Sequence, residues 1–352
     1  MGNAITVGMD MGDKGHTMCV LDNDGEVQSR DSVTNTGQAI RKYFEGLERC
    51  RVVLEAGTHS GWVSRILEEL GHEVLVGNPR KLRAIWESNE KDDDRDAEML
   101  GRIGRLDPKL LSPIRHRGKE AQLDLAVVKA RDMLVTTRSM LITHARGTVK
   151  CTGQRISKCS AEAFHKRLEE QMSEELAVAL EPVMKSIEEL THRIRHYDKV
   201  VEKLGTAKYT ETKGLREING VGPVTALAFV LTLEESSRFE KSRSVGPFLG
   251  LTRKRDRSGE TDKELRISKA GNEYLRRLLV QCAQYILGHF GTDCELRQFG
   301  LKLVARGGKN AKRRAVVAVA RKLAVLMHHL WSSGEAYDPF YQQNHNNQNK
   351  AA

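Results

Sequence analysis

Hydrophobic and polar positions follow two patterns over the first part of the chain. Short apolar runs closed by Gly, Asn or Asp predict strands, and apolar residues spaced three and four apart predict helices. The predicted elements are strands at 4–9, at 16–21 and from Val27, a helix at 38–47, a strand at 51–55, a helix at 61–70, a strand at 73–77, and a helical stretch from Pro79 through 91–96. A tight hairpin turn, Asp22-Asn23-Asp24-Gly25, joins the second and third strands.

The order of these elements is β-β-β-α-β-α-β-α, which predicts an α/β domain over residues 1–115. This is the order of a ribonuclease-H-like domain, although other α/β folds share parts of it.

The middle of the chain, residues 116–205, is predicted to be helical. Residues 120–150 have a helical composition without proline. From residue 176, apolar residues alternate in steps of four and three, a heptad pattern typical of a coiled coil. The positions of this pattern are Leu176, Leu180, Val183, Ile187, Leu190, Ile194, Tyr197, Val201 and Leu204. The pattern predicts a helical hairpin or a subunit contact, and a long core helix of one domain is the alternative. Pro182 predicts that the helix starts or kinks there.

The last region, residues 206–338, is predicted to be mostly helical. Its segment 218–223, Ile-Asn-Gly-Val-Gly-Pro, precedes an Ala-containing helix and is similar to a helix-hairpin-helix turn. In such a turn the amides of Gly220 and Gly222 approach a phosphate, and the next helix starts there. A simple helix–helix turn fits these residues equally well.

Basic residues are concentrated in two segments of this region. Residues 250–259 predict a basic polar loop. Residues 301–322 contain eight basic residues, among them Lys312, Arg313 and Arg314, and no acidic residue. A run of basic residues without any acidic residue indicates contacts with phosphate groups. The Gln-, Asn- and His-rich residues 339–352 predict a disordered tail.

Composition narrows the class of partner. The 352 residues, 39% apolar and 30% charged, are typical of a globular protein of about two domains. Lys and Arg number 57 against 47 acidic residues, and the net charge of +10 favours nucleic acid or an anionic membrane as partner. We expect no membrane insertion, because no apolar run approaches the ~18–20 residues of a span. No secretory signal is recognisable. The six cysteines lack zinc-site or disulfide spacing, so a reducing, cytoplasmic location is expected.

Four acidic residues occupy positions at which they would converge in a ribonuclease-H-like sheet. Asp10 ends the first strand and Glu55 ends a buried strand, while Asp93 and Asp96 project from one face of a helix. Clustered carboxylates repel one another unless a cation neutralises them, and Mg²⁺ is a natural partner. Each acid alone is weak evidence, because a lone acid at such a position is more often a cap, a turn residue or part of a solvated charge run.

Short motifs run in order through nearly the whole chain. They are Gly8-Met9-Asp10, Leu54-Glu55-Ala56-Gly57, Lys91-x-Asp93-x-x-Asp96-Ala97, Gly220-Val221-Gly222, Ser258-Gly259, Ile267-Ser268-Lys269-x-Gly271-Asn272, Leu275-Arg276-Arg277-Leu278-Leu279, 315–323 and Tyr337-Asp338-Pro339. Together they resemble the DEDD-type insertion-sequence transposases, the group that includes the Piv DNA invertase and the bridge-RNA-guided recombinases.

The resemblance implies a RuvC-like domain, a coiled coil and a transposase domain with a serine nucleophile. Its Asp-Glu-Asp-Asp tetrad falls on Asp10, Glu55, Asp93 and Asp96, and its serine falls on Ser258. The basic residues expected to clamp the phosphate are Arg253, Lys254, Arg257 and Lys269, for which solvated loop charge is the alternative. The family often has proline in place of Arg253 and glycine in place of Leu265. Asp92 and Asp94 leave the register of the acidic run open by one residue.

The function implied is that of a site-specific DNA recombinase that excises and inserts its own mobile element. Expected partners are the DNA of the element ends and target, a structured guide RNA, and further copies of the chain in a dimer or tetramer. Attack by Ser258 on a phosphodiester would give a phosphoserine and a free hydroxyl. Mg²⁺ or Mn²⁺ held by the four acids would stabilise the developing charge. Because serine and acids lie in different domains, a composite active site is expected.

Two other functions fit part of the same sequence. One is a RuvC-like junction nuclease, in which the acids hydrolyse DNA with water and the serine is structural. The other is a nucleic-acid-binding module without catalytic activity.

Overall fold

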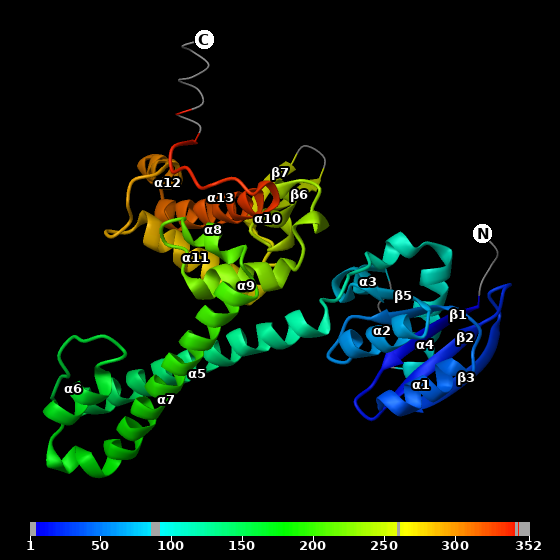
Figure 1. Ribbon diagram of the computed structural model, residues 1–352, viewed down its shortest axis with the longest axis horizontal. Coiled ribbons are helices and arrows are strands. Elements are labelled where there is room, and N and C mark those ends of the chain that lie inside the picture. Colours follow the sequence, from blue (N-terminus) through cyan, green and yellow to red (C-terminus); the bar gives the residue numbers. More distant parts are fainter. Residues whose placement is uncertain (1–4, 86–91, 259–260, 342–343, 345–352) are drawn as a thin grey trace. The chain divides into compact units, whose positions relative to one another are not determined.

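The chain forms two compact units, Met1–Lys119 and Glu120–Ala352, in a computed structural model (Figure 1). The structure describes residues 5–85, 92–258, 261–341 and 344; among these, the side chains of 83–85, 256–258 and 261–264 are not described. Each unit has its own hydrophobic core, so the two are considered separately.

The first unit is built on a five-stranded mixed sheet with the strand order β3-β2-β1-β4-β5. The strands are β1 (Thr6–Met11), β2 (Gly15–Leu21), β3 (Val27–Thr34), β4 (Arg51–Glu55) and β5 (Glu73–Gly77). The first three are antiparallel neighbours, whereas β1–β4 and β4–β5 pair in parallel. The α/β prediction is confirmed, and this topology is consistent with a ribonuclease-H-like sheet.

Helices cover both faces of this sheet. They are α1 (Gly37–Glu45), α2 (Ser60–Glu69), α3 (Pro79–Ile85), α4 (Asp93–Leu106) and the short η1 (Pro108–Leu111). Alternation along β1 explains the two layers, because Val7 and Met9 are buried with residues of α1 and α2. Gly8, between them, faces α4, and a Cβ atom there would lie 1.8 Å from the carbonyl oxygen of Ala97. Only glycine lets the helix lie this close to the strand.

The second unit begins with a long helical hairpin. It consists of α5 (Lys119–Cys151), α6 (Phe164–Gln171) and α7 (Glu174–Ala207). The helix predicted at 120–150 is confirmed by α5. The apolar stripe of α7 differs from the predicted heptad, since Met184 and Thr191 are buried while Val183 and Leu190 are partly exposed. The stripe therefore drifts at the 3.6-residue period of a single helix. Pro182 lies inside α7, which begins eight residues earlier at Glu174, so the helix does not start at Pro182, and the alternative of a kink there stays a prediction.

The rest of the second unit packs around one buried helix. Its elements are α8 (Thr212–Arg216), α9 (Pro223–Leu233), η2 (Ser236–Arg238), η3 (Ser242–Ser244), α10 (Val245–Phe248), β6 (Arg253–Ser258), β7 (Thr261–Ile267), α11 (Glu273–Leu287), α12 (Glu295–Ala305) and α13 (Ala311–Ser333). Helix α9 is buried on all sides from Thr225 to Leu233. Leu125 and Val201 of the helical hairpin belong to the same core.

Two expectations for this region change. The basic segment 250–259 is not a loop throughout, because 253–258 form β6, which pairs with β7. Within the predicted tail, the Pro339 carbonyl accepts a hydrogen bond of 2.9 Å from the Glu295 amide. Most of that tail lies outside the described residues. Within the part of the chain that the structure describes, no helix combines the length and apolar composition that crossing a membrane requires.

Candidate active site

Two of the four candidate acids stand side by side at one edge of the sheet. Met9 of β1 pairs with Leu54 of β4 in parallel register, so the next residues, Asp10 and Glu55, lie at the same level on neighbouring strands. Both are partly buried. Neighbours at the same level of a parallel pair point to the same face, and Asp10 shares the face of Gly8, which is covered by α4.

The direction of α4 follows from contacts along its length. Near its middle, Ala97 packs on Gly8 of β1. Farther on, the Gly104 carbonyl accepts a hydrogen bond of 3.1 Å from Nη1 of Arg51, the first residue of β4. Helix α4 therefore runs antiparallel to β1 and β4. Its first turn lies toward the edge where the two strands end in acids.

The aspartates near the start of α4, which are Asp92, Asp93, Asp94 and Asp96, have different positions on the helix. Asp92 caps the helix, its Oδ1 accepting a hydrogen bond of 3.1 Å from the Asp94 amide. Asp94 precedes Glu98 by one turn and shares its stripe. Asp93 and Asp96 instead precede the buried Ala97 and Leu100 by one turn, so they lie on the side of the helix that continues into the sheet-facing side; Asp96 is partly buried there, and Asp93, at the helix start, is exposed.

On the side of α4 that carries Asp94 and Glu98, two arginines form ion pairs with Glu98. Glu98 accepts a hydrogen bond of 2.8 Å from Nε of Arg102 and one of 2.5 Å from Arg30. These contacts, that with Arg102 first, lower the pKa of Glu98. Asp94 thus lies on a surface of ion pairs, away from the sheet-facing acids.

The chemistry of the four sheet-edge acids suits a hard divalent cation, because all their donors are carboxylate oxygens. Each of the four makes a polar or electrostatic interaction in the structure. Across the described residues, no three His, Cys, Asp or Glu side chains form a group that could hold a metal ion. The backbone thus places Asp10 and Glu55 at one edge and directs the first turn of α4 toward it, and within the described part of the chain these acids do not form a closed metal centre.

A polar cluster that the sequence did not reveal lies at the same edge on the opposite face. His59 Nδ1 accepts a hydrogen bond of 3.3 Å from Trp62 Nε1, so its Nε2 carries the proton and donates to Asp13 Oδ1 over 3.0 Å. The amide nitrogen of Asn35 donates to the Asp13 carbonyl over 2.9 Å. The fully buried His16 lies beside His59, with ring centroids 6.3 Å apart. This cluster ties the loops that follow β1 and β4 together.

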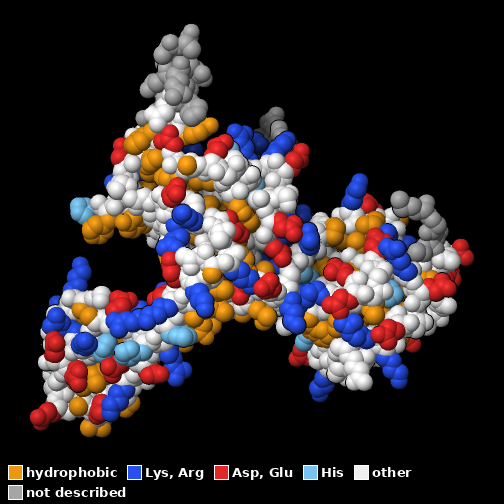
Figure 2. All heavy atoms as spheres, viewed as in Figure 1, with side chains coloured by type: hydrophobic (Ala, Val, Ile, Leu, Met, Phe, Trp, Pro, Cys, Tyr) orange, Lys and Arg blue, Asp and Glu red, His pale blue; other side chains and the backbone are white. Residues whose placement is uncertain are grey.

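Ser258 is the last paired residue of β6, opposite Thr261 at the far end of a two-stranded hairpin. The turn residues 259–260 and the side chains of Arg257 and Ser258 lie outside the described part of the chain. Arg253 and Lys254 are exposed on β6, and Figure 2 shows Lys and Arg side chains on the surface of the second unit. Lys269, which follows β7, is exposed with a φ of +53°.

The glycine turn before α9 has two different glycines. Gly220 has a φ of +92°, and a Cβ atom there would lie 3.0 Å from the Tyr285 ring, so this glycine is needed for conformation and packing. Gly222 is exposed at the N-cap of α9, with open space around it. Gly222 is therefore the more open of the two to an approaching phosphate, and Gly220, which is partly buried, sets the shape of the turn.

A basic surface surrounds the turn between α12 and α13. Its exposed residues are Lys302, Arg306, Lys309, Lys312, Arg313 and Arg314. The structure thus gathers most of the one-sided basic run of the sequence at a single turn.

Comparison with known proteins gives matches in both units. The family model described as "Transposase IS116/IS110/IS902 family" matches residues 212–296, and the model of the IS110-type DEDD transposase domain, described as "Transposase", matches residues 7–152.

Relatives match over most of their length. The chain is 30% identical to the transposase for insertion sequence element IS1111A of Coxiella burnetii, over 81% of this chain and 79% of that protein. It is 30% identical to the putative transposase y4pF/y4sB of Sinorhizobium fredii, over 84% and 76%. It is 25% identical to a probable family 20 transposase of Pseudomonas aeruginosa, over 85% and 89%. The chain therefore belongs to the IS110 family of insertion-sequence transposases, with an N-terminal DEDD domain and a C-terminal Transposase_20 domain.

Proposed function

We propose that this transposase cuts and rejoins the DNA of its element through a covalent bond to Ser258, in a reaction that also requires the acids of the DEDD domain. The observation that carries the proposal is the alignment of Asp10 with Glu55 on neighbouring parallel strands, with the first turn of α4 directed to the same edge. Asp93 and Asp96 lie on the sheet-facing side of that turn.

The serine step conserves the energy of the phosphodiester bond. Oγ of Ser258 gives up its proton and forms a bond to phosphorus, the bond from phosphorus to one sugar oxygen breaks, and that oxygen takes up one proton and leaves as a hydroxyl, so no net proton is gained or lost. Attack by a hydroxyl on the phosphoserine reverses the step and joins a new strand. Mg²⁺ or Mn²⁺, held by Asp10, Glu55, Asp93 and Asp96, would neutralise negative charge that develops on the phosphate.

The nucleic-acid partners are assigned to basic surfaces of the second unit. We assign Arg253, Lys254, Arg257 and Lys269 to the phosphate next to Ser258. We assign Gly220 and Gly222 of the glycine turn, together with Lys312, Arg313 and Arg314 of the α12–α13 turn, to backbone phosphates farther along DNA or a structured guide RNA. Exposed guanidinium and ammonium groups in such a cluster favour polyanions without reading sequence.

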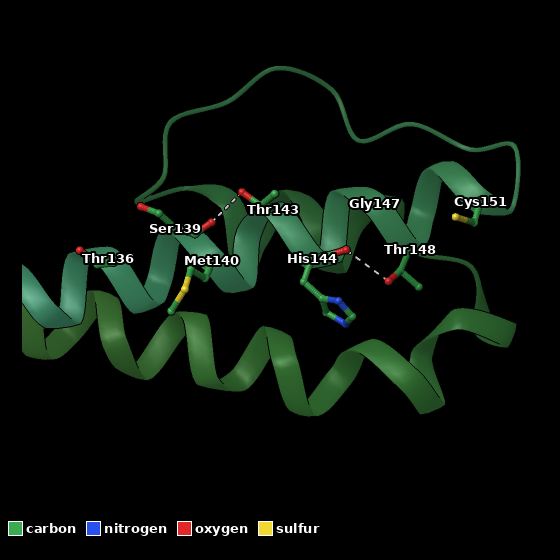
Figure 3. Close-up of a pocket in the computed structure, with 8 residues that line it drawn as sticks. All are labelled: Thr136, Ser139, Met140, Thr143, His144, Gly147, Thr148 and Cys151. Atoms are coloured by element: carbon green, nitrogen blue, oxygen red, sulfur yellow. Dashed lines mark hydrogen bonds between the residues drawn. The ribbon is translucent and has the colours of Figure 1, made fainter.

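We assign the subunit contact of a homo-oligomer to one face of α5. Eight residues line a shallow groove of about 670 Å³ on this helix: Thr136, Ser139, Met140, Thr143, His144, Gly147, Thr148 and Cys151 (Figure 3). The hydroxyls of Ser139, Thr143 and Thr148 donate to carbonyls of the same helix over 2.8, 2.8 and 3.2 Å. With three of its four hydroxyls bonded within the helix, the face presents mainly apolar atoms, and we assign it to α5 of a second copy.

The covalent intermediate provides the decisive test. The full-length protein would be expressed with its flanking DNA and the transcripts of that DNA, then denatured and digested, and DNA-linked peptides would be identified by mass spectrometry. We expect DNA on the peptide that contains Ser258, and no adduct from Ser258→Ala. Ser332→Ala is the matched control, because Ser332 is exposed and its hydroxyl only bonds to the His329 carbonyl over 3.0 Å.

The carboxylate edge also favours a second candidate function, hydrolysis of DNA junctions by water. That function needs Asp10 and Glu55 and does not need Ser258. Cleaved DNA with free ends, formed equally by wild type and Ser258→Ala, would establish it and exclude the covalent route.

A further inference from the structure

Arg276 of α11 is a charged residue in the interior of the second unit. Only 8% of its surface is exposed. Its Nη1 donates two hydrogen bonds of 3.0 Å, one to the carbonyl of Leu249 and one to the carbonyl of Ala270. Leu249 lies on the segment that leads into β6, and Ala270 lies on the segment that leaves β7. A single guanidinium therefore joins both ends of the hairpin that carries Ser258.

The same two segments cross at a distance that only glycine permits. A Cβ atom at Gly250 would lie 2.1 Å from the Ala270 carbonyl oxygen, and one at Gly271 would lie 1.9 Å from the Phe248 carbonyl oxygen. The φ angles of these glycines are +67° and +77°. Two glycines in left-handed conformation and a bonded arginine thus form one tight crossing.

Backbone hydrogen bonds close the base of the hairpin above this crossing. The Ser268 amide donates to the Thr252 carbonyl over 2.8 Å, and the Lys269 amide donates to the Gly250 carbonyl over 3.2 Å. The two strands leave this base together, and Ser258 lies six residues beyond Thr252. At about 3.3 Å per residue the serine is about 20 Å from the base. A tilt of about 10° at the base would therefore move the serine by about 3.5 Å.

We propose that Arg276 is a positioning residue for strand transfer, because it fixes the angle at which the serine hairpin leaves the second unit. This inference rests on the proposed role of Ser258. Misplacement of a reacting group by about 1 Å can cost about 100-fold in rate, so loosening the base would slow the chemical step while DNA binding continues elsewhere.

Arg277 provides a matched control on the same helix. Its side chain is 45% exposed and forms an ion pair with Asp132 of α5. Arg277→Ala removes the same side chain one residue away, and it leaves both carbonyl bonds of Arg276 in place.

The experiment measures adduct formation in single turnover by the full-length protein. The probe is a duplex that carries the joined ends of the element, incubated with the transcript of the flanking DNA. We expect Arg276→Ala to lower the rate of adduct formation at saturating DNA by 30-fold or more, with the Kd for the duplex unchanged within about threefold. Hydrogen exchange of amides 253–258 and 261–267 should accelerate, while that of α9 stays slow. Arg276→Lys, which can still bond one carbonyl, should recover part of the rate, and Arg277→Ala should equal wild type.

Each result decides between distinct possibilities. A wild-type rate in Arg276→Ala, together with no adduct from Ser258→Ala, would refute the positioning role and leave the serine assignment intact. An adduct that persists in Ser258→Ala would refute the proposed function itself. If Arg276→Ala also exposes α9 to exchange, the lysine variant decides: a rate at least fivefold below wild type with α9 protected supports positioning, and an unchanged rate refutes it.

Discussion

At the scale of single residues, neighbours in sequence with the same charge have different surroundings. Asp93 and Asp94 are both in the first turn of α4 and both benefit from the helix dipole. Asp93 lies on the sheet-facing side with Ala97, whereas Asp94 lies on the stripe of Glu98 and its arginines. A comparison of substitutions at Asp93 and Asp94 therefore distinguishes the loss of a metal ligand from the loss of a negative charge near the start of α4.

We expect Asp93→Asn to weaken stabilisation by Mg²⁺, and Asp94→Asn to leave it unchanged. An ion that binds only the folded protein raises its melting temperature, and loss of one carboxylate ligand should lower the apparent affinity by about tenfold, or about 1.4 kcal/mol. Thermal unfolding of the full chain in EDTA and across a Mg²⁺ series measures this effect. Equal Mg²⁺ responses of the two variants would argue against the assignment of the third acid.

Residue types and spacing predicted that Asp10 and Glu55 end neighbouring strands, which the strand register confirms, but the convergence of all four acids stays a prediction and their environment was not predictable. The sequence left Asp92 and Asp94 as alternatives, because a cap is defined by backbone angles that appear only once α4 begins at Asp93. The cluster of His59 and Asp13 could not be predicted either, since it joins loops 46 residues apart. Arg276 was visible only as part of a motif, and its partners are backbone carbonyls that carry no sequence signal.

At the scale of elements, the short strands of the first unit were predicted well, whereas the buried stripe of the long helix α7 was not. The short apolar runs of β1 and β4 predicted these strands correctly, and their pairing follows the predicted order. In α7 a heptad and a 3.6-residue stripe share Leu176, Leu180 and Ile187, so sequence alone could not distinguish them. The basic segment that forms β6 lacks apolar alternation, so it was predicted as a loop.

Strand β2 adds a titratable group to the core of the first unit. His16 is fully buried there. Burial, and to a lesser extent the nearby His59, lower the pKa of His16 below its ordinary value. As pH falls through about 6.5, the unfolded chain takes up the proton first, so the free energy of unfolding falls with pH until the folded histidine also titrates.

We therefore expect the first unit to melt at a lower temperature at about pH 5.5 than at about pH 7.5, and His16→Met to reduce this difference. Burial likewise lowers the pKa of His116, so part of the difference should remain. Calorimetry of the full chain at both pH values gives the melting temperatures, with the exposed His192→Met as control. An unchanged pH dependence in His16→Met would show that this histidine is not responsible.

At the scale of the whole molecule, the groove on α5 makes assembly testable without any nucleic acid. Gly147 lies in the groove, and apart from its own stretch of helix backbone and its two chain neighbours no atom lies within 4 Å of the position that its Cβ would occupy. Leucine should therefore be accommodated in the single chain and should favour the helix by up to about 1 kcal/mol. The same side chain would occupy the space that a second helix needs for close packing.

We expect Gly147→Leu to shift the protein toward the monomer in sedimentation equilibrium, with unchanged helical circular dichroism. Ser186→Leu is the matched control, because it adds the same side chain at an exposed position of α7. Covalent adduct formation should fall with the oligomer if a second copy is needed for strand exchange, and it should be restored at protein concentrations that drive reassociation. A Gly147→Leu protein with the same mass distribution as wild type would exclude this face of α5 as the subunit contact.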